Sequence, residues 1–288
     1  MHDFPSLIRI PLAHWVDKLM DWVLAYFGTF FDALGSVLLK VLLYLEHFFL
    51  WLPWYVVIVL VGALAWKAMG KWWHGLIMAG LLFVIGTFGY WKLSMMTLSL
   101  VTAAVIISLA IGIPTGILMA RSNIFEQLLR PLLDAMQTMP SFVYLIPALM
   151  LFGLGRVPAA FATIIYAVPP VIRLTNVGIR QVPVSVLEAA ESLGSSPRQV
   201  LFNVQLPLAF PSIMVGVNQT TMMALSMVVI ASMIGARGLG LEVLLAINRI
   251  EIGKGFQAGL SIVFLAIIID RITHALAMRQ AKLTNDQS

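Results

Sequence analysis

Apolar intervals free of charged residues follow one another along most of the chain, and their lengths predict how it folds. A helix needs about 20 mainly apolar residues to cross a bilayer, because a rise of about 1.5 Å per residue must cover roughly 30 Å of hydrocarbon. Seven intervals approach or exceed that length: 46–67, 71–92, 92–121, 134–156, 156–173, 198–237 and 254–270. The pattern predicts an all-α fold, a polytopic membrane bundle of about seven transmembrane helices.

The first 46 residues follow a different pattern. Large apolar side chains recur there at helical spacing, beside acidic and basic ones. The apolar set is Trp15, Leu19, Trp22, Val23, Tyr26, Phe27 and Phe30. This spacing predicts an amphipathic helix in the plane of the membrane, resting on lipid or packed on its own bundle. The early charges Asp17, Lys18 and Asp21 argue against a cleaved signal peptide.

Composition supports the membrane assignment and removes several kinds of chemistry. Hydrophobic residues make up 60% of the chain and charged residues 11%, whereas soluble domains carry about 25% charged residues. The 18 basic residues are scattered singly, which indicates membrane-flanking charges and no nucleic-acid partner. Because the chain has no cysteine, disulfides, thiolate metal sites and cysteine nucleophiles are excluded.

One connection, residues 180–207 between the fifth and sixth spans, is long and amphiphilic. Ser185 with Glu188 three residues later predicts a capping box that begins a short helix, and Gly194 suits the left-handed residue that ends it. A second helix start is predicted by Ser196, Pro197 and Gln199. Because a helix of about two turns is marginal alone, we expect a surface on which it docks.

This loop resembles a known signature. Glu188-Ala189-Ala190, Gly194 and Val204-Gln205-Leu206-Pro207 match EAA-x3-G-x9-I-x-LP, found in inner-membrane permease subunits of bacterial ABC importers, with Val204 in place of the usual Ile. The resemblance implies that the loop is a coupling helix seated in a cleft of a cytoplasmic ATPase. The residues assigned to coupling are Ser185, Glu188, Ala189, Ala190, Glu191, Gly194, Ser196, Pro197, Arg198, Gln199, Leu206 and Pro207.

The resemblance extends beyond the loop. Roughly residues 93–277 are similar to permeases for glycine betaine, proline betaine and choline. The runs that carry it are 134–147, 152–155, 166–170, 173–176, 218–227 and 234–240. It implies the permease subunit of an ATP-driven importer for these quaternary ammonium osmolytes in the bacterial inner membrane. The implied partners are a cytoplasmic ABC ATPase, an extracytoplasmic substrate-binding protein, the lipid bilayer and a second permease copy.

The chain divides into four expected parts. They are the in-plane segment 1–46, two accessory spans in 47–92, the permease core 93–277 with its loop at 180–207, and a cytoplasmic tail 278–288. Arg279 and Lys282 come after the last span, which favours a C-terminus inside the cell. With seven spans, the N-terminus then lies outside.

Polar side chains within the spans are candidates for the translocation path, because polar groups are costly in hydrocarbon. Asp134, Gln137, Thr138 and Ser141 fall at i, i+3, i+4 and i+7, which predicts one polar helix face in the fourth span. The sixth span adds Asn218, Thr221 and Ser226. The alternative is that these side chains lie at the headgroups or make hydrogen bonds between helices.

Prolines and glycines mark where helices bend or approach one another. A proline removes a backbone donor, so it can form part of a gate or be a simple kink. The candidate gating prolines are Pro140, Pro147, Pro169, Pro170 and Pro211. Gly112 and Gly116 fit a GxxxG pattern that permits close contact between helices.

Catalytic motifs are missing from the sequence. Gly70-Lys71 is followed by Trp72 and has no earlier glycine of a phosphate loop, and the five histidines show no HExxH spacing. We therefore expect a non-catalytic subunit with no metal and no cofactor of its own, and ATP with Mg²⁺ on the partner ATPase. Two alternatives stay open: a self-sufficient secondary transporter or channel, whose ion site would need acids such as Asp134 or Asp270, or an ABC permease for another small solute.

Overall fold

The computed structural model describes residues 11–285, with side chains described through residue 275. Most of this part of the chain is helical. No strand occurs there, so the predicted all-α class is confirmed. The long helices are α1 (Leu12–Trp51), α4 (Trp91–Arg121), α7 (Arg156–Arg180), α10 (Leu206–Ser232) and α12 (Ile252–Asn285). The shorter ones are α2 (Trp54–Met69), α3 (Trp72–Thr87), α5 (Asn123–Thr138), α6 (Leu145–Phe152), α8 (Val184–Ser192), α9 (Pro197–Gln199) and α11 (Leu239–Arg249).

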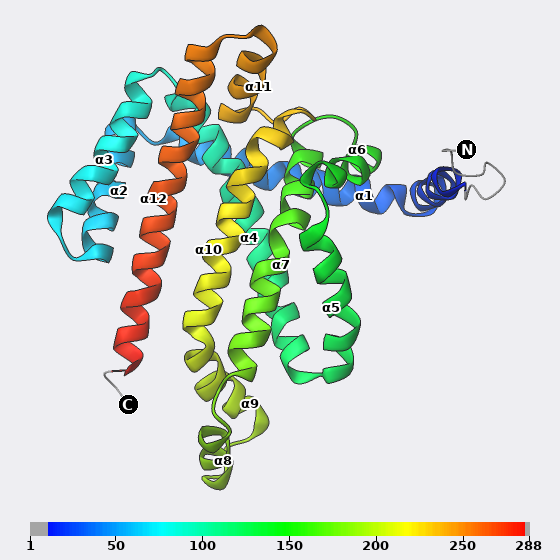
Figure 1. Ribbon diagram of the computed structural model, residues 1–288, viewed down its shortest axis with the longest axis vertical. Coiled ribbons are helices and arrows are strands. Elements are labelled where there is room, and N and C mark those ends of the chain that lie inside the picture. Colours follow the sequence, from blue (N-terminus) through cyan, green and yellow to red (C-terminus); the bar gives the residue numbers. More distant parts are fainter. Residues whose placement is uncertain (1–10, 286–288) are drawn as a thin grey trace, which may run out of the picture.

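Helices α4, α7 and α10 form the centre of the bundle (Figure 1). A Cβ atom on Gly116 of α4 would lie 2.6 Å from the carbonyl oxygen of Ile172 in α7, and one on Gly112 would lie 2.3 Å from Cγ1 of Val171. On the other side of α7, a Cβ atom on Gly178 would lie 2.7 Å from Cβ of Ser212 in α10. The contact predicted from Gly112 and Gly116 is confirmed, because only glycine leaves room for backbones this close.

The number of spans agrees only approximately with the prediction. By length and composition, five of the described helices could cross a membrane, or six if the bent pair α5 and α6 is one span. The two accessory spans expected in 47–92 are α2 and α3, which have 16 residues each and form a hairpin against α12 and α4. At about 1.5 Å per residue each is shorter than a full crossing.

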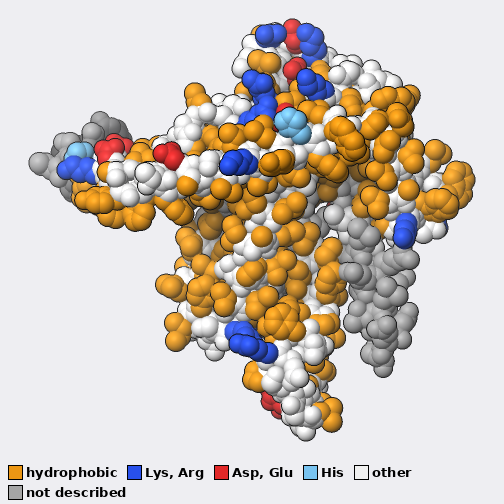
Figure 2. Space-filling view, turned by 180° about the vertical axis from the view of Figure 1, so that it is seen from behind, with side chains coloured by type: hydrophobic (Ala, Val, Ile, Leu, Met, Phe, Trp, Pro, Cys, Tyr) orange, Lys and Arg blue, Asp and Glu red, His pale blue; other side chains and the backbone are white. Residues whose placement is uncertain are grey.

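Helix α1 runs across the bundle, although it is long and apolar enough to span a membrane (Figure 1). Its middle packs on α4 and α6 through the buried residues Gly35, Leu38 and Leu42. In Figure 2, the exposed part of α1 carries acidic side chains on its upper side and hydrophobic ones on its lower side. The crosswise direction supports the predicted in-plane helix.

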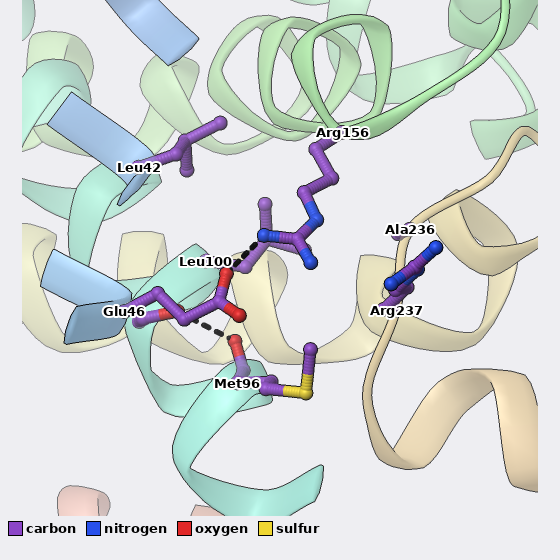
Figure 3. A pocket seen from close by; sticks show the side chains of 8 residues that line it. Leu42, Glu46, Met96, Leu100, Arg156, Ala236 and Arg237 are labelled. Carbon is purple, nitrogen blue, oxygen red and sulfur yellow. Dashed lines mark hydrogen bonds and ion pairs between the residues drawn. The ribbon is translucent and has the colours of Figure 1, made fainter. Parts of the chain in front are cut away.

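An ion pair fastens α1 to the start of α7. Glu46 of α1 pairs with Arg156, beside a small cavity that Ser99 and Arg237 also line (Figure 3). Both side chains are largely shielded from solvent. Helix α1 is therefore attached at the end of the bundle opposite to residues 180–207 (Figure 1), which we call the far end. The end that holds residues 180–207 is called the loop end.

The fourth predicted span, 134–156, is interrupted at Pro140, one of the candidate gating prolines. Helix α5 ends at Thr138, and the segment Ser141–Phe152, a short 3₁₀ turn followed by α6, leaves it at 112°. Pro140 causes the break: it has no N–H to continue the helix, and it forces the preceding Met139 into an extended conformation with ψ 133°. The other gating candidates lie within helices that continue: Pro147 in α6, Pro169 and Pro170 in α7, and Pro211 in α10.

Candidate functional site

The loop that carries the EAA signature projects beyond the ends of the neighbouring helices (Figure 1). Helix α8 contains no buried residue, and Glu188, Ala189 and Glu191 are exposed. Two apolar side chains beside them, Val184 and Leu193, are also exposed. These two were not among the predicted coupling residues, although they lie at the two ends of α8. An exposed helix with mixed charged and apolar side chains provides a surface for a partner.

Of the two helix starts predicted in the loop, the first is wrong. Helix α8 begins at Val184 after Pro183, no side chain caps it, and Ser185 lies in its first turn. Pro183 starts the helix instead, because its ring fixes φ at −57° and it has no N–H that needs an acceptor. The predicted end is confirmed: Gly194 has φ 83°, and the Ser195 N–H donates to the Ala190 carbonyl at 3.1 Å.

The second predicted helix start, at Ser196, Pro197 and Gln199, is confirmed, because both hydrogen bonds of its capping box form. The Ser196 N–H donates to Oε1 of Gln199 at 2.8 Å, and the Gln199 N–H donates to Oγ of Ser196 at 3.4 Å. The helix that begins here is not a separate short one, however. A π-helical turn over Val200–Gln205 joins α9 to α10, so one helix runs from Pro197 to Ser232. The second half of the loop is therefore the extended end of the sixth span.

A polar cluster holds the first half of the loop where it leaves α7. The guanidinium of Arg180 contacts Oε2 of Glu126 at 3.0 Å, and it donates to Oδ1 of Asn123 at 2.9 Å and to the Met119 carbonyl at 2.8 Å. Asn176 accepts from Nε of Arg180 at 3.0 Å and donates to Oε1 of Glu126 at 3.2 Å. These contacts join α4, α5 and α7 directly above the loop.

A second contact holds the other half of the loop. Nη2 of Arg121, at the end of α4, donates to the Pro197 carbonyl at 3.2 Å. Arg121, Glu126 and Asn123 were not predicted as part of the site, because no local spacing connects them with residues 176–197. Together with the helical continuity into α10, these bonds tie any displacement of the loop to three helices of the core.

The polar face predicted in the fourth span is not continuous. Asp134 pairs with Arg173 of α7, and the Thr138 hydroxyl donates back to the Asp134 carbonyl at 3.2 Å. Gln137 is exposed, and Ser141 lies beyond the break at Pro140. The stripe fails as one helix face because the helix ends within it. That these residues line the translocation path remains a prediction.

The polar residues of the sixth span make hydrogen bonds to helices. Nδ2 of Asn218 donates to Oδ1 of Asp270 at 2.9 Å, and Thr273 donates to Oδ1 of Asn218 at 2.9 Å, which links α10 to α12. Thr221 and Ser226 donate to carbonyls of their own helix. Asn218 thus has the interhelical role that was the alternative to lining a path.

The described helices form a bundle with several candidate membrane spans and an exposed loop tied to its core. Residues 112–282 match the family described as binding-protein-dependent transport system inner membrane component. The chain belongs to this family and is a multi-pass inner-membrane transport component. This confirms the resemblance found from the loop signature.

The chain is similar to permease proteins of glycine betaine transport systems. The glycine betaine/proline betaine transport system permease protein ProW of Escherichia coli (strain K12) is 49% identical over 269 residues, covering 93% of this chain and 75% of that protein. The glycine betaine/carnitine transport permease protein GbuB of Listeria monocytogenes serotype 1/2a (strain 10403S) is 49% identical, covering 94% and 97%. The glycine betaine transport system permease protein OpuAB of Bacillus subtilis (strain 168) is 42% identical, covering 97% and 99%.

A solved structure shares the fold. A chain of the MetNI methionine ABC transporter in an inward-facing conformation superimposes with a TM-score of 0.53 at 17% identity. The match covers 67% of this chain and 93% of that one. At this identity the likeness concerns the fold alone.

Proposed function

We propose that this chain is the permease subunit of an ATP-driven importer for quaternary ammonium osmolytes, and that residues 180–207 couple it to a separate cytoplasmic ATPase. The names of similar permeases, which include glycine betaine, proline betaine, carnitine and choline, support these quaternary ammonium compounds as the substrate class. The observation that carries the coupling role is the loop itself, which is exposed, carries the EAA signature and continues into α10. A second permease copy and an extracytoplasmic binding protein complete the proposed assembly.

The proposed orientation puts the loop end inside the cell and the far end outside. Helix α12 runs from the far end toward the loop end, so the C-terminus would lie inside (Figure 1). The crosswise helix α1 would then rest on the outer face of the membrane, with the N-terminus outside. ATP and Mg²⁺ would bind the partner ATPase, and this chain would supply no catalytic residue.

The mechanism follows from how the loop is attached. When the ATPases close, they push on α8. The end of this helix at Gly194 is fixed by the hydrogen bond from the Ser195 N–H to the Ala190 carbonyl. The push passes into α10 through the continuous helix and into α4, α5 and α7 through Arg121 and Arg180. The bundle then changes between inward-open and outward-open arrangements, driven by the difference in contacts that the ATPases make with the two states.

The test is uptake of labelled glycine betaine, proline betaine and choline by vesicles that contain the permease, its ATPase and its binding protein. Glu188→Lys and Gly194→Val should both abolish uptake and the coupling of ATP hydrolysis to uptake. Glu188→Lys reverses a charge on α8, the proposed docking helix. Gly194→Val forces a β-branched residue to φ 83°. Both variants should insert normally, since neither position is buried. The matched control is Asp32→Lys, the same kind of charge reversal on exposed α1.

Three outcomes would contradict the proposal. Normal uptake by both loop variants would remove the coupling role. Uptake that continues without any ATPase would favour the secondary transporter. Transport of none of the labelled compounds by an otherwise active complex would exclude the proposed substrate class.

A further inference from the structure

The helix that joins the loop to the sixth span contains one turn of a different kind. Over Val200–Gln205 it is π-helical, and the Leu206 N–H donates to the Leu201 carbonyl, five residues earlier instead of four. No other π-helical turn occurs among residues 11–285. A π turn holds one residue more than an α turn, so an extra residue lies where the exposed loop joins the bundle.

The proline that follows this turn does not explain it by itself. Pro207 has no N–H, and in an α-helix its ring would press against the Asn203 carbonyl, which a wider turn avoids. However, α4, α5, α7 and α10 each contain an internal proline and keep α-helical turns around it. Because the chain accommodates these prolines without a π turn, an α-helical turn is also available to residues 200–205.

The extra residue decides which side chains face the core. Leu201 and Ala209 are both buried, and a Cβ atom on Gly178 of α7 would lie 3.3 Å from Cβ of Ala209. Leu201 precedes Ala209 by eight residues, so a regular α-helix would place the two about 80° apart around its axis. With one residue taken up by the π turn, they are about 20° apart. The π turn therefore puts Leu201 on the same helix face as Ala209, which packs on α7.

The residue after Leu201 fits the same place when the turn is α-helical. Phe202 is 62% exposed and precedes Ala209 by seven residues. In a regular α-helix it would lie about 20° from Ala209, at the position that Leu201 now occupies. Leu201 would take the position of Val200, which is buried now and would turn to about 180° from Ala209. Because all three residues are apolar, either register keeps two apolar side chains in the core.

We propose that residues 200–206 form a joint with two registers, and that closure of the ATPases changes it from the π turn to an α turn. The change replaces Leu201 by Phe202 on the face that packs on α7. It turns the Pro197 end of the joint by about 100° and moves it about 1.5 Å along the axis relative to α10. Since Nη2 of Arg121 donates to the Pro197 carbonyl, the same step breaks a contact between the loop and α4. This inference rests on the proposed function, because the ATPases supply the driving force.

The first experiment follows the register by thiol labelling. The chain has no cysteine, so Val200→Cys, Leu201→Cys and Phe202→Cys each provide a single reactive site. Each variant is reconstituted in lipid nanodiscs with the ATPase and binding protein that support its uptake. Maleimide labelling is compared without nucleotide and after the ATPases are trapped with ATP and vanadate. On trapping, Phe202→Cys should lose its labelling and Val200→Cys should gain it, while Leu201→Cys stays protected.

Opposite responses of two neighbouring sites would exclude a simple covering of the joint. A partner that covers this surface would protect Phe202→Cys without exposing Val200→Cys, so protection alone overturns the proposal. Unchanged labelling in a complex with ATP-dependent uptake also overturns it and leaves the proposed function intact. Uptake that needs no ATPase contradicts the proposed function itself, and the driving force for the register change is lost with it.

The second experiment blocks one register. Phe202→Asp keeps an exposed side chain exposed in the π register, whereas the α register would bury its charge. Uptake should therefore fall about tenfold or more, because an unpaired buried charge disfavours that register by at least this factor. Binding of the ATPase without nucleotide and the midpoint of thermal unfolding should stay unchanged. Phe202→Leu, which keeps an apolar side chain, should retain uptake.

The matched control for the added charge is Ile124→Asp, because Ile124 is another exposed apolar residue at the loop end, in the first turn of α5. It should leave uptake unchanged. Normal uptake by Phe202→Asp overturns the proposal. Loss of ATPase binding by this variant also overturns it, because Phe202 would then be a contact of the partner and not a second core residue.

Discussion

The centre of the bundle and the loop at residues 180–207 are stabilised in opposite ways. At the centre, α4, α7 and α10 lie so close that glycines replace side chains at their crossings, and most residues of α7 are buried. In the loop, α8 buries no residue and depends on its terminal hydrogen bonds and on the contacts of Arg121 and Arg180. A closely packed centre can move only as a unit, whereas an exposed loop can be gripped by a partner.

The largest expected effect is at the centre. Gly116→Val should destabilise the protein by about 3 kcal/mol or more, because its Cβ would lie 2.6 Å from the Ile172 carbonyl oxygen, and neither backbone can move away. The measurement is thermal unfolding in detergent together with the yield of folded protein. The control is Gly80→Val in α3, where a Cβ meets no atom within 4 Å and stability should hold. Equal stability of the two variants would contradict the close packing of α4 on α7.

A smaller effect is expected at the junction between the two regions. Arg180→Ala removes four contacts and leaves Glu126, whose side chain is 22% exposed, without its cation. Because the pair is only partly buried, we expect a loss of about 1–2 kcal/mol together with weaker coupling of ATP hydrolysis to uptake.

Two further variants test whether the effect of Arg180→Ala arises from the polar cluster around Arg180. Arg130→Ala, at an exposed arginine on neighbouring α5, should change neither stability nor coupling. Adding Glu126→Gln to Arg180→Ala should recover part of the lost stability, because it removes the unpaired charge. Additive effects of the two substitutions would show that Arg180 and Glu126 do not act together.

The smallest effect is expected within the loop. Ser196→Ala removes one half of the capping box and should cost about 1 kcal/mol or less, because the site is exposed and Gln199 can still accept from the backbone. Global unfolding should scarcely change, whereas hydrogen exchange of the Arg198 and Gln199 amides should increase. Ser195→Ala, one residue earlier, removes no capping bond and should leave that exchange as it is. An equal increase in both variants would show that the capping box does not stabilise this turn.

Local patterns predicted local structure well where the deciding atoms are near one another in sequence. The end at Gly194 and the capping box of Ser196 with Gln199 were both predicted, because their hydrogen bonds join residues three to five positions apart. The box at Ser185 was wrong because Pro183 starts the helix first. Pro140 was named as a place where a helix could bend, but the 112° turn was not foreseen, since it depends on what α6 packs against.

The sequence by itself determined the all-α membrane class, the position of the loop that carries the EAA signature, and the family, because apolar lengths and a spaced motif are properties of the linear chain. Only the tertiary structure decided that α1 lies across the bundle, that Arg180 pairs with Glu126, and that Asn218 joins α10 to α12. Side chains more than 50 residues apart meet only through helix packing, and a single sequence carries no local signal of such a meeting. The π turn at Val200–Gln205 was likewise invisible in the sequence, since the register of a turn is known only when the helix has packed.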